Sequence, residues 1–143
     1  MKYLTIHCAA TPEGRDVKAA QINEWDKVKF GQTSYHWVVE LNGNKVRGLA
    51  DNKKGAHVGG HNTGNIGVCY VGGVAKDAKT VKDTRTDAQK KALRELVGEY
   101  KKLYPGIKVM GHRDWSPDKN KDGKIPPDEW MKGCPSFDVA TQL

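Results

Sequence analysis

A histidine and a cysteine near the end of this chain are of residue types that bind transition metals. They are His112, in Gly-His-Arg, and Cys134, in Lys-Gly-Cys-Pro. Imidazole nitrogen and thiolate sulfur both suit Zn²⁺, but a site needs at least a third protein ligand. The best candidate is His7, because segment 3–7 has the pattern of a short buried strand that ends in this histidine. Three such ligands leave a fourth position for water, as catalytic zinc sites do, so we expect a zinc hydrolase.

The three cysteines have different surroundings. Cys8 follows His7 on the expected strand and points to the opposite face, and Cys69 lies within an apolar segment, so both are interpreted as small core residues. Three widely spaced cysteines do not indicate a secreted disulfide framework. We therefore expect synthesis in a reducing compartment, with Cys134 as the only cysteine placed for chemistry.

Length and composition restrict the class of protein. The chain has 143 residues, which fits a single domain over residues 1–143. No apolar run approaches the ~18 residues of a membrane span, so no membrane insertion is expected. The stretch before the first polar residues is too short for a signal peptide, so we expect synthesis in the cytoplasm and export, if it happens, by another machine.

The formal net charge of +7 calls for an anionic partner or none. The basic residues are spread along the chain without a concentrated arm or a nucleic-acid module, which argues against nucleic acid as the partner. A polyanionic surface such as a bacterial cell wall fits equally well, and charge alone does not choose. We expect a monomer.

Apolar patterning predicts four strands at 3–7, 35–41, 66–71 and 107–111. The turn Asn42-Gly43 joins the second strand to a hairpin partner at 45–49. A helix capped by Asp16 carries an apolar stripe up to Phe30, with Trp25 in the core along with Trp37. A second helix begins after Thr86, where Gln89 completes a capping box, and a short helix or tail follows Phe137. Because the hairpin is antiparallel and helices alternate with strands, we predict an α/β fold, a mixed β-sheet with helices on its faces.

Five segments match one family in order across nearly the whole chain. They are Ile6-His-Cys-Ala-Ala-Thr, Ser34-Tyr-His-Trp-Val-Val, Gly55-Ala-His with Asn65-Ile-Gly-Val-Cys-Tyr-Val-Gly-Gly, Gly111-His-Arg, and Lys132-Gly-Cys-Pro-Ser-Phe-Asp. The sequence resembles the type 2 N-acetylmuramoyl-L-alanine amidases, most closely their small phage-lysozyme branch. The resemblance implies the amidase fold, which peptidoglycan recognition proteins share.

The resemblance also implies a reaction and its residues. The reaction is zinc-dependent hydrolysis of the amide between the lactyl group of N-acetylmuramic acid and the first L-alanine of the peptidoglycan stem. This would place the action of the protein on the cell wall, after release or delivery. His7, His112 and Cys134 correspond to the zinc ligands, and Tyr35 and Lys132 to the catalytic side chains. A lysine ammonium near the metal suits the oxyanion of the tetrahedral intermediate. A phenol with a pKa near ~10 can orient the water or donate to the carbonyl, but is a poor base at neutral pH.

Three further histidines need separate interpretations. His36 directly follows Tyr35, so an alternating strand turns it away from the site, and we interpret it as structural. His57 and His61 lie in a glycine-rich loop, and we predict that they bind substrate or support the metal ligands rather than bind metal themselves.

Segment 118–129 carries a second metal signal. It matches the twelve-residue calcium loop of EF-hands in ligand type, with a glycine at its sixth position. Three interleaved lysines and the lack of evident flanking helices leave a solvated turn as the alternative. The candidate calcium ligands are Asp118, Asn120, Asp122, Lys124 and Glu129.

Two other functions remain open at this stage. A non-catalytic peptidoglycan-binding module of the recognition-protein type usually lacks a zinc ligand, whereas all three are present here. A role in binding nucleic acid rests on the net charge alone.

Overall fold

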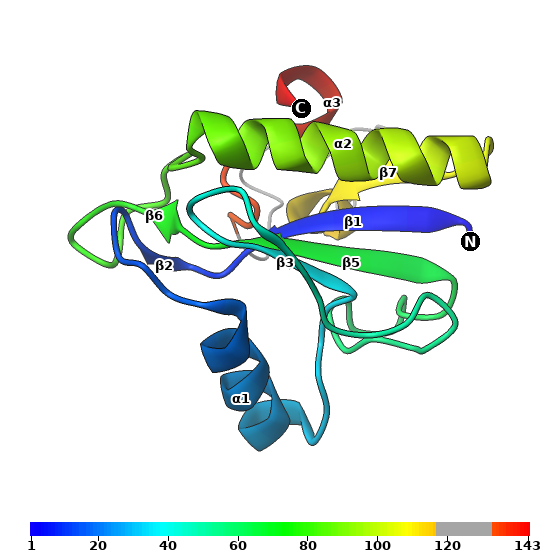
Figure 1. Ribbon diagram of the computed structural model, residues 1–143, viewed down its shortest axis with the longest axis horizontal. Coiled ribbons are helices and arrows are strands. Elements are labelled where there is room, and N and C mark those ends of the chain that lie inside the picture. The colour runs from blue at the N-terminus through cyan, green and yellow to red at the C-terminus, as the bar shows by residue number, and fades with distance from the viewer. Residues whose placement is uncertain (117–132) are drawn as a thin grey trace.

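A mixed five-stranded sheet forms the centre of the protein (Figure 1). The computed structural model describes residues 1–116 and 133–143. The strand order is β4-β3-β5-β1-β7, in which β1 pairs in parallel with β5 and β7, β3 in parallel with β5, and β4 antiparallel with β3. The predicted mixed sheet is confirmed. Its strands are β1 (Tyr3–Cys8), β3 (Trp37–Val39), β4 (Lys45–Arg47), β5 (Asn65–Tyr70) and β7 (Lys108–Gly111).

The hairpin strands are shorter than the predicted segments 35–41 and 45–49, although the pairing continues beyond them. The backbone N–H groups of Gly48 and Leu49 still donate to the carbonyls of His36 and Tyr35. A separate two-stranded sheet pairs β2 (Thr11–Pro12) with β6 (Gly73–Val74) beside the ends of β1 and β5.

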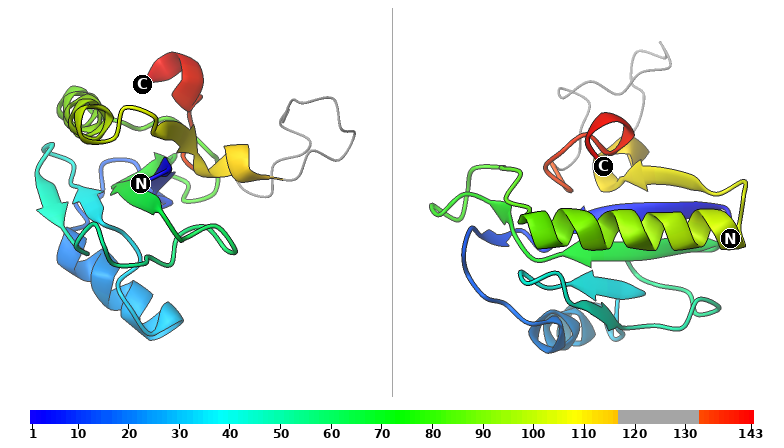
Figure 2. Two further views of the ribbon diagram at one scale, coloured as in Figure 1. Left: turned by 90° about the vertical axis from the view of Figure 1, so that its right-hand side faces the viewer. Right: turned by 45° about the horizontal axis from the view of Figure 1, so that its top comes forward.

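Helix α2 (Asp87–Leu103) lies along one face of the sheet (Figure 2). As predicted, Thr86 is its N-cap, and Gln89 completes the capping box. The apolar side of the helix packs against Leu4 and Ile6 of β1 and the matching residues of β5. The apolar residues that recur at the helical period therefore form one side of the main hydrophobic core.

Helix α1 (Ala19–Phe30) lies on the other side of the sheet (Figure 2), and here two predictions are wrong. The helix begins at Ala19 with Lys18 as N-cap, not at Asp16. Trp25 is 46% exposed rather than in the core. The reason is that only the first turns of α1, at Ala19 and Ile22, reach the apolar cluster on this face, and the helix then runs away from the sheet.

Side chains along β1 point alternately into the hydrophobic core and toward the face of the sheet that carries the candidate site. Leu4, Ile6 and Cys8 belong to the cluster under α2, so Thr5 and His7 face the other side of the sheet. Trp37 is half-buried against this cluster, as expected for a core residue. The short α3 (Val139–Gln142) packs near β7. Among the described residues, no helix is long and apolar enough to cross a bilayer.

Candidate active site

The three predicted metal ligands converge at the carboxyl ends of two parallel strands. His7 projects from β1, His112 begins the 3₁₀ helix η1 (His112–Trp115) directly after β7, and Cys134 lies on a turn near the C-terminus. Their candidate ligand atoms all lie within 4.8 Å of one another. His7 is fully buried, whereas His112 and Cys134 are half-buried. Two imidazoles and one thiolate around a partly open position are a donor set that suits zinc better than magnesium or calcium.

The sulfur of Cys134 is held by the end of β1. The backbone N–H of Cys8 donates to Cys134 Sγ over 3.1 Å, and the N–H of Arg113 donates to the Cys134 carbonyl over 2.8 Å. Cys8 is buried in the core as predicted, but its backbone also supports the candidate ligand. A hydrogen bond with the Cys8 side chain, together with burial, raises the pKa of the Cys134 thiol. A bound cation acts in the opposite direction, because it stabilises the thiolate.

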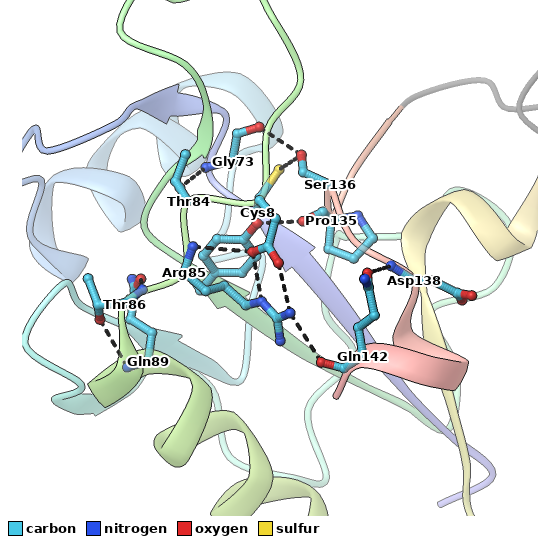
Figure 3. A network of polar contacts seen from close by, with 12 residues as sticks. Cys8, Gly73, Thr84, Arg85, Thr86, Gln89, Pro135, Ser136, Asp138 and Gln142 are labelled. Atoms are coloured by element: carbon cyan, nitrogen blue, oxygen red, sulfur yellow. Dashed lines mark hydrogen bonds and ion pairs between the residues drawn. The ribbon is translucent and has the colours of Figure 1, made fainter.

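Polar contacts fix the turn that carries Cys134 (Figure 3). The hydroxyl of Ser136 donates to the Gly73 carbonyl over 2.7 Å. The buried side chain of Arg85 forms an ion pair with Asp83, and its guanidinium lies 3.4 Å from the centroid of the Phe137 ring. The turn is therefore tied to β6 and to the segment before α2.

Arg85 also reaches the C-terminal helix. Its Nη2 donates to the carbonyl of Gln142 over 3.1 Å (Figure 3). One side chain thus contacts both Phe137 and the C-terminal helix α3, and sequence reasoning did not single it out. A buried arginine usually pairs with an acidic residue. The acidic Asp83, two positions earlier, is therefore the signal in the sequence that could have pointed to Arg85.

Tyr35 lies beside the candidate ligands, just before β3. Its ring centroid is 5.2 Å from that of His7. Burial raises the pKa of the Tyr35 phenol well above its usual value. The hydroxyl therefore stays protonated at neutral pH, so it can donate a hydrogen bond but cannot act as a general base.

His57 contacts a candidate ligand directly. Its Nδ1 is 2.9 Å from His7 Nε2, and its Nε2 is 3.0 Å from the carbonyl oxygen of Asn65. Burial lowers the pKa of His57 to about 4, so the ring is neutral at neutral pH. His57 lies in the predicted glycine-rich loop. Its contact with His7 fits the predicted role of supporting a candidate metal ligand.

A cavity of about 560 Å³ opens beside His112. One wall is formed by His61 and Trp115, whose rings stack with centroids 4.6 Å apart. Trp115 Nε1 donates to Thr5 Oγ1 over 3.0 Å, which fixes the indole above β1. The sequence analysis missed Trp115 and Phe30 as lining residues, although Trp115 lies only three positions after His112. The lining residues are Phe30, Ala56, His57, Val58, Gly59, His61, Asn62, His112, Trp115 and Ser116.

His36 is buried against the backbone, consistent with its structural interpretation. Its Nδ1 accepts from the Gly67 N–H over 3.0 Å, and its Nε2 lies 2.7 Å from the Lys53 carbonyl. Both ring nitrogens are thus engaged by main-chain groups.

Some predicted residues lie outside the described part of the chain. Lys132 and the whole candidate calcium segment 118–129 fall between residues 116 and 133. The catalytic role of Lys132 and the calcium site stay predictions. The calcium residues concerned are Asp118, Asn120, Asp122, Lys124 and Glu129.

Comparison with known proteins identifies the family. The family model for N-acetylmuramoyl-L-alanine amidase matches residues 1–128. The chain belongs to this amidase family. The endolysin of Klebsiella phage KP32 is 35% identical to this amidase-family chain over 136 residues, which cover 94% of this chain and 80% of the endolysin. An uncharacterised protein of Haemophilus influenzae is 46% identical over 89 residues, covering 62% of this chain and 76% of that protein.

Solved structures share the amidase fold at lower identity. The Ph2119 endolysin from a Thermus scotoductus bacteriophage superposes with a TM-score of 0.68 at 20% identity, covering 93% of this chain and 75% of the endolysin. Drosophila peptidoglycan recognition protein SD gives a TM-score of 0.66 at 19% identity, covering 93% of this chain and 73% of that protein. The predicted fold of the amidase family is confirmed.

Proposed function

We propose that the protein is a zinc-dependent hydrolase of the amide bond between the lactyl group of N-acetylmuramic acid and the first L-alanine of peptidoglycan. The observation that carries this proposal is the convergence of His7, His112 and Cys134 within 4.8 Å in a member of the amidase family. Phage endolysins among the relatives support a bacterial cell wall as the site of action. We accordingly propose that the protein acts on the wall after release or delivery.

The side chains around the three ligands suit amide hydrolysis. When bound, zinc would polarise the scissile carbonyl and lower the pKa of a bound water to about 7. Tyr35, which stays protonated, would donate a hydrogen bond to the substrate carbonyl or orient the attacking water. Lys132 would place its ammonium near the developing oxyanion, a role that rests on its position two residues before Cys134.

The cavity beside His112 is the proposed binding site for the glycan–peptide substrate. Its volume of about 560 Å³ is in the range of sites that bind small molecules. The stacked rings of His61 and Trp115 offer an apolar surface to a sugar or a peptide stem. We propose that His61 and His57, which both line the cavity, contact substrate.

Digestion of purified sacculi tests this function. The wild-type protein should release stem peptides, detected by mass spectrometry as chains that begin with L-alanine. Removal of metal with a chelator should abolish release, and added Zn²⁺ should restore it. Cys134→Ala should be inactive even with zinc present, because one of three ligands is lost. Arg94→Ala, a substitution at an exposed position of α2 remote from the site, is the control and should retain release.

Two results would contradict the proposal in different ways. Release that persists after complete metal removal would overturn the zinc mechanism. Retention on sacculi without any release by the zinc-loaded protein would support a non-catalytic recognition module instead.

A further inference from the structure

We propose that His57 is a positioning residue that selects the ring nitrogen with which His7 binds the metal. This inference rests on the proposed zinc site and adds a residue that acts on the metal through His7. Its basis is a chain of two hydrogen bonds, from His7 to His57 and from His57 to the backbone of Asn65.

The direction of both hydrogen bonds follows from the last acceptor. A backbone carbonyl can only accept, so the 3.0 Å contact between His57 Nε2 and the Asn65 oxygen requires the proton on Nε2. In the neutral ring Nδ1 is then an acceptor. Across the 2.9 Å contact, His57 Nδ1 therefore accepts a hydrogen bond from the Nε2–H of His7. His7 is thereby held as the Nε2–H tautomer, and its Nδ1 carries the lone pair that would bind the metal.

The structure contains a dedicated space for the His57 ring. A Cβ atom at Gly67 on β5 would lie 2.7 Å from His57 Cδ2. A Cβ at Gly55 would lie 2.7 Å from the same atom and 2.5 Å from the Ser34 carbonyl oxygen. Only glycine fits at both positions without moving the ring. The glycine in the middle of β5, where it is otherwise unfavourable, is thus explained by the imidazole above it.

Hydrogen bonds also fix the backbone on both sides of this ring. Asn62 Oδ1 accepts from the N–H groups of His57 and Val58 over 2.9 and 2.8 Å. The side chain of Asn65 donates to the His61 carbonyl over 2.9 Å and accepts from the Thr5 hydroxyl over 2.8 Å. The acceptor carbonyl and the histidine loop are therefore held in one arrangement with β1.

A metal-bound histidine usually donates its other ring N–H to a carboxylate, a carbonyl or water, and this contact orients the ring. Here the partner of His7 is the His57 imidazole, which in turn donates to the Asn65 carbonyl. His57 does not need to touch the metal or the substrate to affect the site. Its loss should weaken metal binding about 10–100-fold, the usual cost of removing such a partner.

Nuclear magnetic resonance tests the tautomers in the unaltered protein. Two-bond ¹H–¹⁵N correlation spectra of the metal-free wild type at pH 8 report which nitrogen of each histidine carries the proton. The Nε2–H form is expected for both His7 and His57. The Nδ1–H form at either residue would overturn the inference, and this test does not depend on the folding of any variant.

Zinc affinity provides the second test, measured by competition with a chromophoric chelator. His57→Phe keeps the ring shape but cannot accept a hydrogen bond, so its zinc affinity should fall about 10–100-fold. His57→Asn places an amide oxygen near the position of Nδ1 and should recover part of the loss. His61→Phe, in the same loop but stacked on Trp115, should retain wild-type zinc affinity.

The outcomes separate this inference from the proposed function. Wild-type zinc affinity in a folded His57→Phe would overturn the positioning role, even if sacculi are digested normally. Zinc binding that depends on His57 in a protein that releases no stem peptide would support the positioning role and contradict the hydrolase. Zinc affinity no higher in the wild type than in Cys134→Ala would overturn both.

Discussion

At the scale of single residues, the site combines groups with restricted protonation states. Burial raises the pKa of the Tyr35 phenol, which stays protonated, and lowers the pKa of the His57 imidazole, which stays neutral. A phenol that keeps its proton and an imidazole that stays neutral at neutral pH add no charge of their own beside the candidate metal ligands. The chemistry of the site therefore depends on burial as much as on residue type.

Tyr35→Phe removes the proposed donor and little else. We expect kcat for a soluble muropeptide to fall about 10²–10³-fold, the typical cost of losing one hydrogen-bond donor to a developing oxyanion. Zinc content should stay unchanged. Tyr104→Phe, beyond the end of α2, is the matched control and should retain activity. Full activity in Tyr35→Phe would show that the hydroxyl has no part in the reaction.

At the scale of elements, the segments that carry the site are joined by polar side chains at their ends. Thr86 caps α2 and also donates from its hydroxyl to the Leu41 carbonyl over 2.8 Å, which links the helix to the hairpin turn. Arg85, one residue earlier, reaches the turn after Cys134. The start of α2 thus connects the main helix, the hairpin and the turn that carries Cys134.

Thr86→Ala should destabilise the fold without affecting the metal site directly. The lost N-cap typically costs about 1 kcal/mol of the free energy of unfolding. Urea denaturation followed by circular dichroism measures this change. Thr63→Ala, at an exposed position in the turn before β5, is the control and should stay within about 0.5 kcal/mol of the wild type. Equal midpoints for the two variants would contradict the role of the cap.

Arg85→Ala should affect both stability and metal binding. The substitution removes the cation over Phe137 and the partner of Asp83, so we expect a loss of about 2 kcal/mol in the free energy of unfolding. Zinc affinity should also fall, because the turn that carries Cys134 loses a support. Arg94→Ala should leave both quantities unchanged. A destabilised Arg85→Ala with unaltered zinc affinity would show that the turn is held by its other contacts.

At the scale of the whole molecule, the basic charge is the feature that the site does not explain. The net charge is +7, while peptidoglycan carries free carboxylates on its peptide stems. Long-range attraction to such a polyanionic surface raises the rate of association and is screened by salt. The charge thus suits a protein that has to find an insoluble anionic substrate.

Binding to sacculi should therefore weaken as salt increases. With Cys134→Ala, which cannot turn over the proposed substrate, co-sedimentation should decrease between about 50 and 500 mM NaCl, where the Debye length falls from about 14 to about 4 Å. Sucrose at equal osmolality is the control and should have no such effect. Salt-independent sedimentation would assign binding to the cavity contacts instead.

The sequence alone determined the local structure and the residue types of the candidate ligands. Period-two and period-3.6 patterns are local, so the β1 strand, the capping of α2 and the hairpin at Asn42-Gly43 could be predicted. The same patterns misplaced Trp25, because an apolar stripe does not tell how far a helix remains in contact with the sheet.

Only the tertiary structure decided which residues meet at the site. Cys8 and Cys134 are 126 positions apart, and His7 and His57 are 50 apart, yet hydrogen bonds join both pairs. Such contacts depend on strand order and on parallel pairing, which no local pattern encodes. The sequence therefore supplied the three candidate ligands, while the fold supplied their spacing and the neutral histidine that we propose orients one of them.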